Sequence, residues 1–227
     1  LLMVADGADI IDVGGESTRP GAEPVDVQEE LDRVMPVIDA LVAGGLAVPI
    51  SIDTYKPLVA DQAVQAGACI INDVHGLLGD PHMAEIAALH DAAVIAMHWD
   101  KDRDRSLPLL ENISRYFETS IAVAERAGIS SEKLIVDPGF GFSKSLQENY
   151  ELLRHVGRVG VVGGHEFPVL VGTSRKSMIG KVLGNEPAER VAGTVATSVL
   201  GYMAGGHIFR VHDVRANKDA LRIAEAT

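Results

Sequence analysis

The feature that most constrains the fold is a series of short apolar runs that alternate with helical patterns. Seven runs rich in Ile, Val, Leu and Ala recur at intervals of roughly 20 to 40 residues, and most are continuous rather than alternating. Continuous runs are typical of strands that are covered on both faces. The predicted strands cover residues 9–13, 48–53, 69–74, 92–98, 134–139, 168–173 and 207–213. The helical patterns between them cover residues 27–45, 56–68, 80–92, 113–128, 145–156 and 189–206.

Strand–helix repeats of this kind predict an α/β protein with a parallel sheet. An open doubly wound sheet and a closed (β/α)8 barrel both fit the pattern. No glycine-rich dinucleotide fingerprint follows the first visible strand, where the chain reads GGESTRPG, and that stretch is not a P-loop either. Nucleotide-binding motifs therefore give no support to the open sheet.

Polar residues at the strand ends decide between the two folds. In an open sheet the chemistry gathers at one switch point, whereas in a barrel all carboxyl ends of the strands converge on one site. Nearly every predicted strand here closes with a polar residue, so we predict a (β/α)8 TIM barrel. These residues are Asp12, Asp53, Asn72, Asp73, His98, Asp137, Thr173, Arg210, His212 and Asp213.

The strand count is one short of a barrel, which needs eight strands. The chain begins inside an apolar helical pattern, LLMVADGA, with Gly7 at its expected end. We therefore expect residues 1–227 to form a single barrel domain whose first strand and first loop are absent from this sequence. An incomplete sequence explains the count better than a complete barrel with fewer strands.

Composition excludes several classes of protein. The net charge of −12 is unsuited to general nucleic-acid binding, which needs a basic footprint. No apolar run approaches the length of a membrane span, and the acidic N-terminus is unlike a signal peptide. The single cysteine, Cys69, allows no intramolecular disulfide and lies in the run CIIND, so we expect a buried strand thiol and a reducing, cytoplasmic setting.

Three strand ends carry carboxylate or amide groups with two possible roles. Asp53 closes SIDTYK and could either cap the next helix or bind a ligand. Asn72 and Asp73 pose the same question one strand later, where Asp73 could be a turn residue. Asp137 opens DPGFGF, which alone is a weak turn signal. On one rim, these groups could together bind a flat ring with adjacent N–H donors.

Basic residues follow the last two predicted strands. In SRKS, Arg175 and Lys176 could bind an anion or a carbonyl oxygen, or form a solvated turn. In RVHDVR, strand alternation predicts that Arg210 and His212 lie on the same side. An Arg and a His together suit a phosphate or diphosphate group.

Other histidines and charges carry weaker signals. His75 and His98 lie at strand ends without an assigned role, whereas His82 and His90 fall in a helical pattern and are expected at the surface. No zinc-type spacing of His or Cys is present. The stretch DKDRDR, residues 100–105, is predicted to be a solvated loop.

Six stretches together resemble the dihydropteroate synthase family and stand in the family's order. They are DVGGESTRPGA, SIDTYK, GACIINDV, DPGFGFSKS, VLVGTSRKSMIG and HIFRVHDVRA, and they cover nearly the whole chain. The resemblance implies a (β/α)8 barrel and a sulfonamide-sensitive type of transferase in folate biosynthesis. It would condense 7,8-dihydropterin-6-ylmethyl diphosphate with 4-aminobenzoate, giving 7,8-dihydropteroate and diphosphate.

The resemblance also implies roles for residues that hold the pterin substrate. The pterin ring would be bound by Asp53, Asn72, Asp137, Lys176 and Arg210. Arg210 would stack on the ring and, with His212, hold the diphosphate. The catalytic set implied in this way is Asp53, Lys176, Arg210 and His212.

The remaining implied roles concern 4-aminobenzoate and magnesium. Thr18, Arg19 and Pro20 would lie on a mobile second loop that completes the aminobenzoate pocket, together with Phe142 and Ser177. Mg²⁺ would assist the leaving group. Its asparagine ligand in the family belongs to the first loop, NVTPDSF-like, which this sequence lacks.

Two rival interpretations stay open. A pterin-dependent methyltransferase domain shares the barrel and the Asp/Asn pterin residues, but it does not need STRPG, SRKS and RVHDV together. A non-catalytic pterin-binding paralogue would be expected to lose the residues that bind diphosphate and those of the second loop, and both sets are intact here. The missing first loop leaves this alternative open. The family usually forms homodimers, so we expect one.

Overall fold

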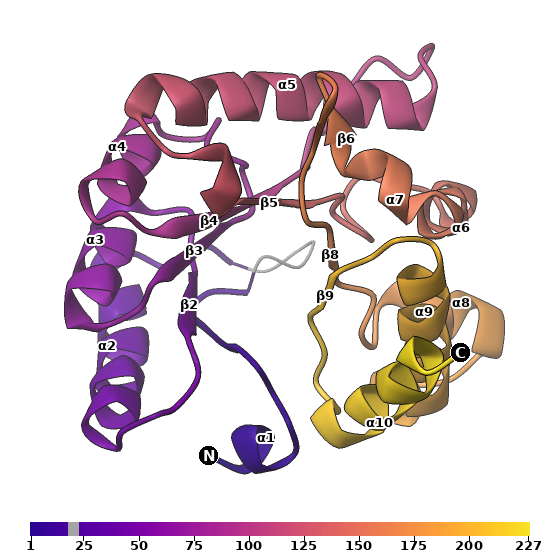
Figure 1. The fold of residues 1–227 in the computed structure, drawn as a ribbon, viewed down its shortest axis with the longest axis horizontal. Helices are drawn as coiled ribbons and strands as arrows, with labels where there is room; N and C mark the ends of the chain where they lie inside the picture. The colour runs from indigo at the N-terminus through magenta and orange to yellow at the C-terminus, as the bar shows by residue number, and fades with distance from the viewer. Residues whose placement is uncertain (18–22) are drawn as a thin grey trace. The chain divides into compact units, whose positions relative to one another are not determined.

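The computed structural model describes residues 1–17 and 23–227 (Figure 1). The chain divides into two compact units, each described here by itself. The first unit comprises Leu1–Val4, Ala8–Met97 and Thr119–Leu134, and the second comprises Ala5–Gly7, His98–Glu118 and Ile135–Thr227. Two helices, α1 (Leu2–Ala5) and α5 (Leu109–Ala127), contribute residues to both units.

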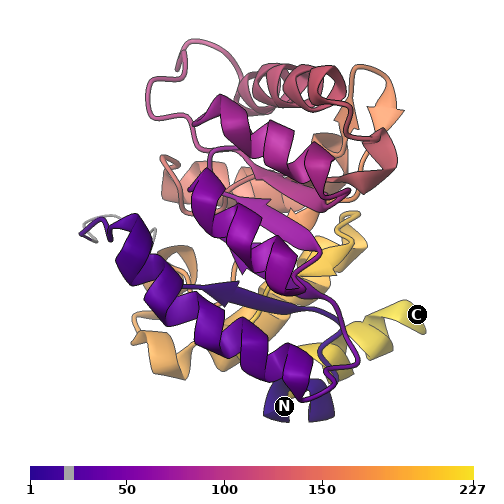
Figure 2. The same cartoon turned by 90° about the vertical axis from the view of Figure 1, so that its left-hand side faces the viewer.

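The first unit is a parallel sheet with helices on one face. Its strands are β1 (Ile11–Gly14), β2 (Ile50–Asp53), β3 (Ile70–Asp73) and β4 (Ala93–Met97), and they pair in sequence order. Figures 1 and 2 show the three covering helices stacked side by side against the strands. These are α2 (Val27–Ala43), α3 (Pro57–Ala66) and α4 (Pro81–Leu89), and a 3-10 turn, η1 (Ser131–Lys133), follows α5.

Local sequence signals explain where these helices begin. The Asp26 side chain accepts a hydrogen bond from the backbone N–H of Glu29 and so caps α2. Asp80 caps α4 in the same way, and Pro57 and Pro81 occupy first-turn positions, where no backbone N–H is needed. The β2 and β3 side chains are almost entirely buried, as continuous apolar runs predict.

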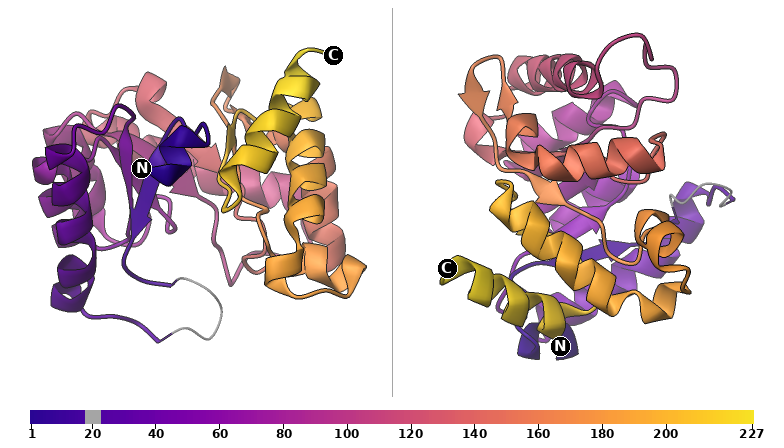
Figure 3. Two further views of the ribbon diagram at one scale, coloured as in Figure 1. Left: turned by 90° about the horizontal axis from the view of Figure 1, so that it is seen from below. Right: turned by 90° about the vertical axis from the view of Figure 1, so that its right-hand side faces the viewer.

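The second unit contains the carboxyl-terminal strands and a layer of helices. Val136 of β5 (Leu134–Asp137) forms a parallel bridge with Val169, and β8 (Leu170–Val171) pairs in parallel with β9 (Ile208–Phe209). Figure 3 shows the helices of this unit, where α9 packs on α6, α8 and α10. The elements are α6 (Leu146–Arg154), α7 (Val156–Val159), the hairpin β6 (Val161–Val162) and β7 (His165–Glu166), α8 (Ser177–Leu183), η2 (Pro187–Glu189), α9 (Val191–Met203) and α10 (Val214–Glu225).

All seven predicted strand regions contain a strand, and all six predicted helical regions contain a helix. The helix predicted at the N-terminus is the single turn α1, and Gly7 follows with a φ of 101°. The β6–β7 hairpin and α10 were not predicted. No helix in the described residues is long and apolar enough to cross a membrane. The prediction of one domain over residues 1–227 stays a prediction.

Three expectations from the sequence are wrong. Cys69 is exposed rather than buried, because β3 begins only at Ile70 and the thiol lies before the strand. Arg103 is only 6% exposed, although the rest of 101–105 is solvent-exposed, because its guanidinium pairs with Glu148. Strand alternation does not place Arg210 and His212, because β9 ends at Phe209.

Candidate active site

In the first unit, adjacent strands bring predicted pterin residues side by side. Asp53 lies opposite Asn72 and Gly14 in the sheet register. Asn72 is buried and its side-chain amide donates to Asp12 Oδ2 over 3.4 Å, whereas Asp53 is half-buried at the carboxyl end of β2. The N-cap of α3 is Lys56, not Asp53. The capping role considered for Asp53 is therefore excluded.

The neighbouring Asp73 has the turn role that its position suggested. Its two carboxylate oxygens accept the backbone N–H groups of His75, at 2.9 Å, and Leu77, at 2.8 Å. Burial raises the pKa of Asp73, and the two backbone donors oppose that shift. Asp73 therefore stabilises the turn after β3, where Leu77 has a φ of 66°.

A charged cluster stands at the base of the loop after β1. The Lys56 ammonium pairs with Glu16 and, at 2.5 Å, with Glu30 of α2. The Tyr55 hydroxyl donates to Glu16 over 2.8 Å. Burial tends to lower the pKa of Lys56, but its two carboxylate partners raise it above the usual value. The cluster thereby ties this loop to α2 and α3.

In the second unit, Asp137 is the centre of the candidate site. It is buried at the end of β5, and its Oδ1 accepts the backbone N–H of Gly139 over 2.7 Å. Burial raises the pKa of Asp137, while the charges of Lys176, Lys144 and Arg210 act in the opposite direction. Gly172 lies beside both charged groups, because a Cβ there would be in ordinary contact with Asp137 Oδ2, at 3.9 Å, and Lys176 Nζ, at 3.8 Å.

Lys176 connects the Asp137 region to an aromatic group. Its ammonium donates to the backbone carbonyl of Phe140 over 2.5 Å and lies 5.0 Å from the centre of the Phe142 ring. Phe142 in turn meets Trp99 edge-on, with ring centres 5.2 Å apart. A cation beside an aromatic ring suits a flat aromatic ligand. In the described structure the Lys176 ammonium is held by a backbone carbonyl, and ligand binding by SRKS stays a prediction.

Ser174 holds the imidazole ring of His212 in place. The Ser174 Oγ lies 2.8 Å from His212 Nδ1 and accepts the backbone N–H of His212 over 3.1 Å. A serine hydroxyl can accept two hydrogen bonds and donate one, so Oγ can either donate to Nδ1 or accept from it. In both cases Ser174 holds the imidazole ring through Nδ1 and leaves Nε2 as the ring nitrogen for a ligand.

Arg175 does not share this anion-binding role. It forms a two-point ion pair with Asp213, with distances of 3.0 and 2.7 Å, while its backbone N–H donates to Thr194. Its φ of 56° turns the chain between β8 and α8. The two basic residues of the motif therefore have different roles, because Arg175 fixes the turn and Lys176 faces the Asp137 region.

The other predicted site residues are placed as follows. Arg210 and His212 are exposed and follow β9, and the Arg210 backbone N–H still donates to Val171. Ser177 is exposed at the start of α8. The predicted loop residues Thr18, Arg19 and Pro20 lie outside the described residues. The structure thus groups Asp53 with Asn72 in one unit, and Asp137 with Lys176 and Phe142 in the other.

Sequence reasoning missed the residues that hold the site's loops. Lys56 and Glu16 in the first unit, and Lys144 and Arg103 in the second, make buried polar networks without having been assigned a role. The signal available was a lysine in each of two strand-end motifs, SIDTYK and DPGFGFSKS. Among the residues that the structure describes, no group of three or more His, Cys, Asp or Glu side chains could hold a metal ion.

Comparison with known proteins identifies the family. The sequence pattern of pterin binding enzymes matches residues 1–212. A dihydropteroate synthase from Escherichia coli strain K12 is 46% identical over 234 residues, which cover 100% of this chain and 80% of the relative. The chain belongs to the dihydropteroate synthase family. It is accordingly a transferase of the folate-biosynthesis type, as the sequence motifs predicted.

Solved structures of the family agree with the predicted fold class. A dihydropteroate synthase from Clostridium difficile, determined in the presence of pteroic acid, has a TM-score of 0.94 and 48% identity over 99% of this chain and 84% of its own. The Xanthomonas albilineans enzyme with 4-aminobenzoic acid has a TM-score of 0.92 and 45% identity over 99% and 81% of the two chains. The (β/α)8 barrel class is therefore confirmed.

Proposed function

We propose that this chain condenses 7,8-dihydropterin-6-ylmethyl diphosphate with 4-aminobenzoate to form 7,8-dihydropteroate and diphosphate. The observation that carries the proposal is the arrangement of Asp137 beside Lys176 and Phe142, in a chain that matches family enzymes over its whole length. Family structures carry pteroic acid and 4-aminobenzoic acid, the product-like and amine ligands of this reaction.

Pterin recognition is proposed from the donor and acceptor types of the residues that the resemblance selects. A pterin ring presents adjacent N–H donors and ring acceptors at its edge. Asp53 and Asp137 supply acceptors, Asn72 supplies both kinds of group, and Lys176 donates. Fixed partners already orient these groups, since Gly139 holds Asp137 and strand register holds Asp53 beside Asn72. We propose that all four residues contribute to pterin binding.

Departure of diphosphate requires stabilisation of negative charge. Arg210 would stack on the pterin ring and donate to the diphosphate, and His212 would donate from Nε2. The Ser174 hydroxyl supports this role because it contacts Nδ1 and leaves Nε2 for the ligand. The leaving group would thus meet a permanent cation and a histidine ring that Ser174 holds in place.

The bond to 4-aminobenzoate forms once the pterin methylene carries positive charge. Loss of diphosphate leaves a cation that spreads into the pterin ring, and a nearby carboxylate, above all Asp53, would favour it. The arylamine nitrogen is neutral at pH 7, so it attacks without a strong base and then loses a proton. Phe142 and Ser177, together with the loop residues Thr18, Arg19 and Pro20, are proposed to form the aminobenzoate pocket.

Magnesium is proposed as a cofactor of the reaction, as the family resemblance implies. No cluster of carboxylates or histidines suited to a metal occurs in residues 1–17 and 23–227. Mg²⁺ is commonly held by substrate phosphates with only one or two protein ligands. No step is therefore assigned to the metal. Homodimer formation and a cytoplasmic location also stay proposals, supported by the family's habit and by a single free cysteine.

The deciding experiment measures diphosphate release by the full-length protein with dihydropterin diphosphate and Mg²⁺, with and without 4-aminobenzoate. Release that depends on the amine, with dihydropteroate formed, would establish the synthase. Tight binding of pterin diphosphate without turnover would instead favour the non-catalytic paralogue. Methyl transfer from a methylated pterin would favour the methyltransferase domain.

The role of Asp53 can be tested in the same assay. Replacing Asp53 by Asn keeps its size and one acceptor oxygen but removes the charge proposed to favour the developing cation. We expect kcat to fall by about 100-fold, while pterin affinity changes by less than about tenfold. An unchanged kcat would rule out this electrostatic role.

A further inference from the structure

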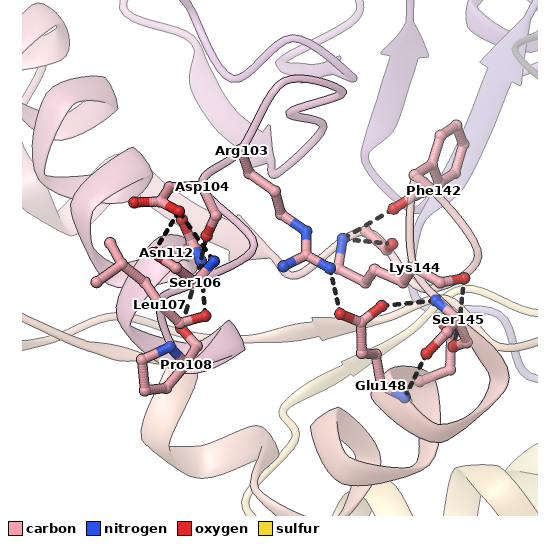
Figure 4. Close-up of polar contacts among 12 residues, drawn as sticks. Arg103, Asp104, Ser106, Leu107, Pro108, Asn112, Phe142, Lys144, Ser145 and Glu148 are labelled. Atoms are coloured by element: carbon pink, nitrogen blue, oxygen red, sulfur yellow. Dashed lines mark hydrogen bonds and ion pairs between the residues drawn. The ribbon is translucent and has the colours of Figure 1, made fainter.

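The second unit contains a buried polar network around Lys144 that the proposed mechanism does not use (Figure 4). The Lys144 ammonium lies 3.0 Å from the Gly139 carbonyl oxygen, 3.1 Å from the Phe142 carbonyl oxygen and 3.0 Å from His98 Nδ1. Lys144 thus contacts both ends of the short loop that precedes it. No carboxylate accepts a hydrogen bond from Lys144 among the contacts that the structure describes.

The loop between β5 and α6 needs this support because its backbone is unusual. Gly139, Gly141 and Ser143 all have positive φ angles, of 68°, 82° and 51°. Such a path leaves carbonyl groups without regular partners, and a buried carbonyl without a donor costs free energy. Asn149 of α6 supports the middle of the loop, where its side chain accepts the Gly141 N–H over 2.6 Å. Lys144 supports the two ends.

His98 completes the network as a neutral ring. It is 1% exposed and meets Tyr116 edge-on, with ring centres 4.8 Å apart. Burial lowers the pKa of His98 to about 3, and the charges of Lys144 and Arg103 add to that effect. A charged Lys144 has three protons for its three neighbours, so His98 Nδ1 must accept and the proton must sit on Nε2.

The network reaches Asp137 through two backbone contacts. The His98 backbone N–H donates to the Asp137 carbonyl over 2.8 Å, and the Gly139 N–H holds the Asp137 carboxylate. The same Gly139 residue accepts from Lys144 through its carbonyl. A Cβ on Gly139 would lie 2.1 Å from the His98 carbonyl oxygen, so the two segments pack with no space between them. A shift of Lys144 therefore moves the group that orients Asp137.

An ion pair beside Lys144 joins the same two segments. Arg103, from the loop after β4, pairs with Glu148 of α6, and Glu148 also accepts the Ser145 backbone N–H over 2.7 Å (Figure 4). Ser145 and Glu148 form a complete capping box, which fixes the start of α6 immediately after Lys144. Asp137, Lys176, Arg103 and Glu148 are the charged groups that act on Lys144.

We propose that Lys144 is a positioning residue for the condensation. It holds the Gly139 and Phe142 carbonyls and the His98 ring in one hydrogen-bond set, and thereby fixes the Asp137 carboxylate and the Phe142 ring for substrate. This inference rests on the proposed function. Lys144 does not touch the substrate or the reacting atoms in this account, and it acts through the loop alone.

The kinetic test compares Lys144→Met with a matched control in the full-length protein. Met keeps the unbranched length but removes every donor. We expect kcat/KM to fall by about 10- to 100-fold, mainly through a higher KM for dihydropterin diphosphate, because the lost contact orients a binding carboxylate. Lys181→Met removes an exposed lysine of α8 and should stay within about twofold of wild type. Equal effects of the two substitutions would overturn the inference.

Chemical rescue separates positioning from simple loss of a large side chain. In a Cys69→Ser background, Lys144→Cys can be alkylated with bromoethylamine in denaturant and refolded, which restores an ammonium at nearly the original reach. Activity should return to within about tenfold of the parent. Failure of a folded, fully alkylated protein to regain activity would contradict the role. An inactive parent would instead reject the proposed function.

A spectroscopic measurement on the unaltered protein keeps the inference testable if every variant misfolds. Long-range ¹H–¹⁵N spectra of the histidine rings report which nitrogen carries the proton. At about pH 6, His98 should be neutral, with Nδ1 unprotonated and accepting from Lys144. A proton on Nδ1 would show that Lys144 does not donate to the ring and would overturn the proposed network.

Discussion

Two lysines hold strand-end loops in the two units, and they do so with opposite partners. Lys56 in the first unit pairs with the carboxylates of Glu16 and Glu30. Lys144 in the second unit contacts two backbone carbonyls and a neutral histidine. Both are largely shielded from water, so burial opposes the charge of each. The two sites therefore show the same residue type, a shielded lysine, beside charged partners in one case and uncharged partners in the other.

The comparison shows that partner charge decides the pKa of a buried lysine. Carboxylates raise the pKa of Lys56 above its usual value despite burial. Burial lowers the pKa of Lys144 to about 7, with Asp137 opposing the shift and Lys176 and Arg103 adding to it. Carbonyl dipoles satisfy hydrogen bonds without supplying a full negative charge. Lys56 is thus a permanent cation at neutral pH. The pKa of Lys144, in contrast, lies close to neutral pH.

The largest effect is expected when Lys56 is replaced by Met. The substitution leaves two carboxylates unpaired, and the Glu30 side chain is only 1% exposed. Breaking a buried ion pair from one side costs about 3–5 kcal/mol of unfolding free energy. Urea denaturation of wild type and variant at neutral pH measures this difference.

An exposed ion pair in α10 supplies the control. Arg215→Met removes the partner of Asp219, and both side chains are mostly exposed. The unfolding free energy should change by less than about 0.5 kcal/mol. Equal losses for the two substitutions would mean that the Lys56 cluster behaves as a surface pair, and the contrast with Lys144 would disappear.

Gly139→Ala should disrupt the loop that Lys144 holds, through the backbone rather than through the lysine. The new Cβ would lie 2.1 Å from the His98 carbonyl oxygen, at a φ of 68°. Overpacking and left-handed backbone strain together should cost about 2–4 kcal/mol. Thermal and urea unfolding measure the loss, and kcat/KM should fall with it because the same residue orients Asp137.

Gly163 separates steric overlap from backbone strain in that experiment. It lies between β6 and β7 with a φ of 59°, and a Cβ there would meet nothing within 4 Å. Gly163→Ala should therefore cost only about 1–2 kcal/mol. If Gly139→Ala costs no more than Gly163→Ala, the close packing of Gly139 on His98 is not what sets the stability of this loop.

Sequence patterns predicted the strands well because each has a continuous apolar run. The side chains of Ile50–Asp53 and Ile70–Asp73 are almost entirely buried on both faces, so the apolar run of each strand is enough to predict it. The prediction failed where residues outside the run decide the outcome. Cys69 shares an apolar stretch with β3 but precedes it, and Arg103 is buried only because Glu148 lies 45 residues away in sequence and close in space.

In the candidate site too, some residues could be predicted from their own sequence motif and others depend on contacts that the motif does not show. Asp53, Asn72 and Asp137 could be selected because they lie at or next to the last residue of a strand, and Lys176 because its motif matches the family. Lys144 stands inside an equally visible motif, DPGFGFSKS, yet nothing local says that its ammonium turns back to Gly139 and Phe142. That contact depends on the positive φ angles of the loop. Side chains that position others are therefore harder to predict than those that meet the ligand.

The smallest expected effect is a difference between the two lysines in how their contribution to the unfolding free energy depends on pH. Between about pH 7 and 10.5, Lys144 is protonated in the unfolded chain but not in the folded one, so the unfolded state binds more protons. The unfolding free energy that Lys144 contributes should therefore rise with pH, by up to about 1.4 kcal/mol per pH unit. Lys56 stays protonated in both states over this window, and its stabilisation is lost only as the pH rises through its raised pKa.

Urea denaturation at pH of about 7, 8 and 9 tests this difference, because contributions from other groups cancel between wild type and variant. Wild type should gain stability over this range relative to Lys144→Met, whereas the difference between wild type and Lys56→Met should stay constant. Parallel pH profiles for wild type and Lys144→Met would mean that Lys144 is a permanent cation like Lys56. The carbonyl oxygens around Lys144 would then match carboxylates in effect, and partner charge would no longer explain the contrast between the two units.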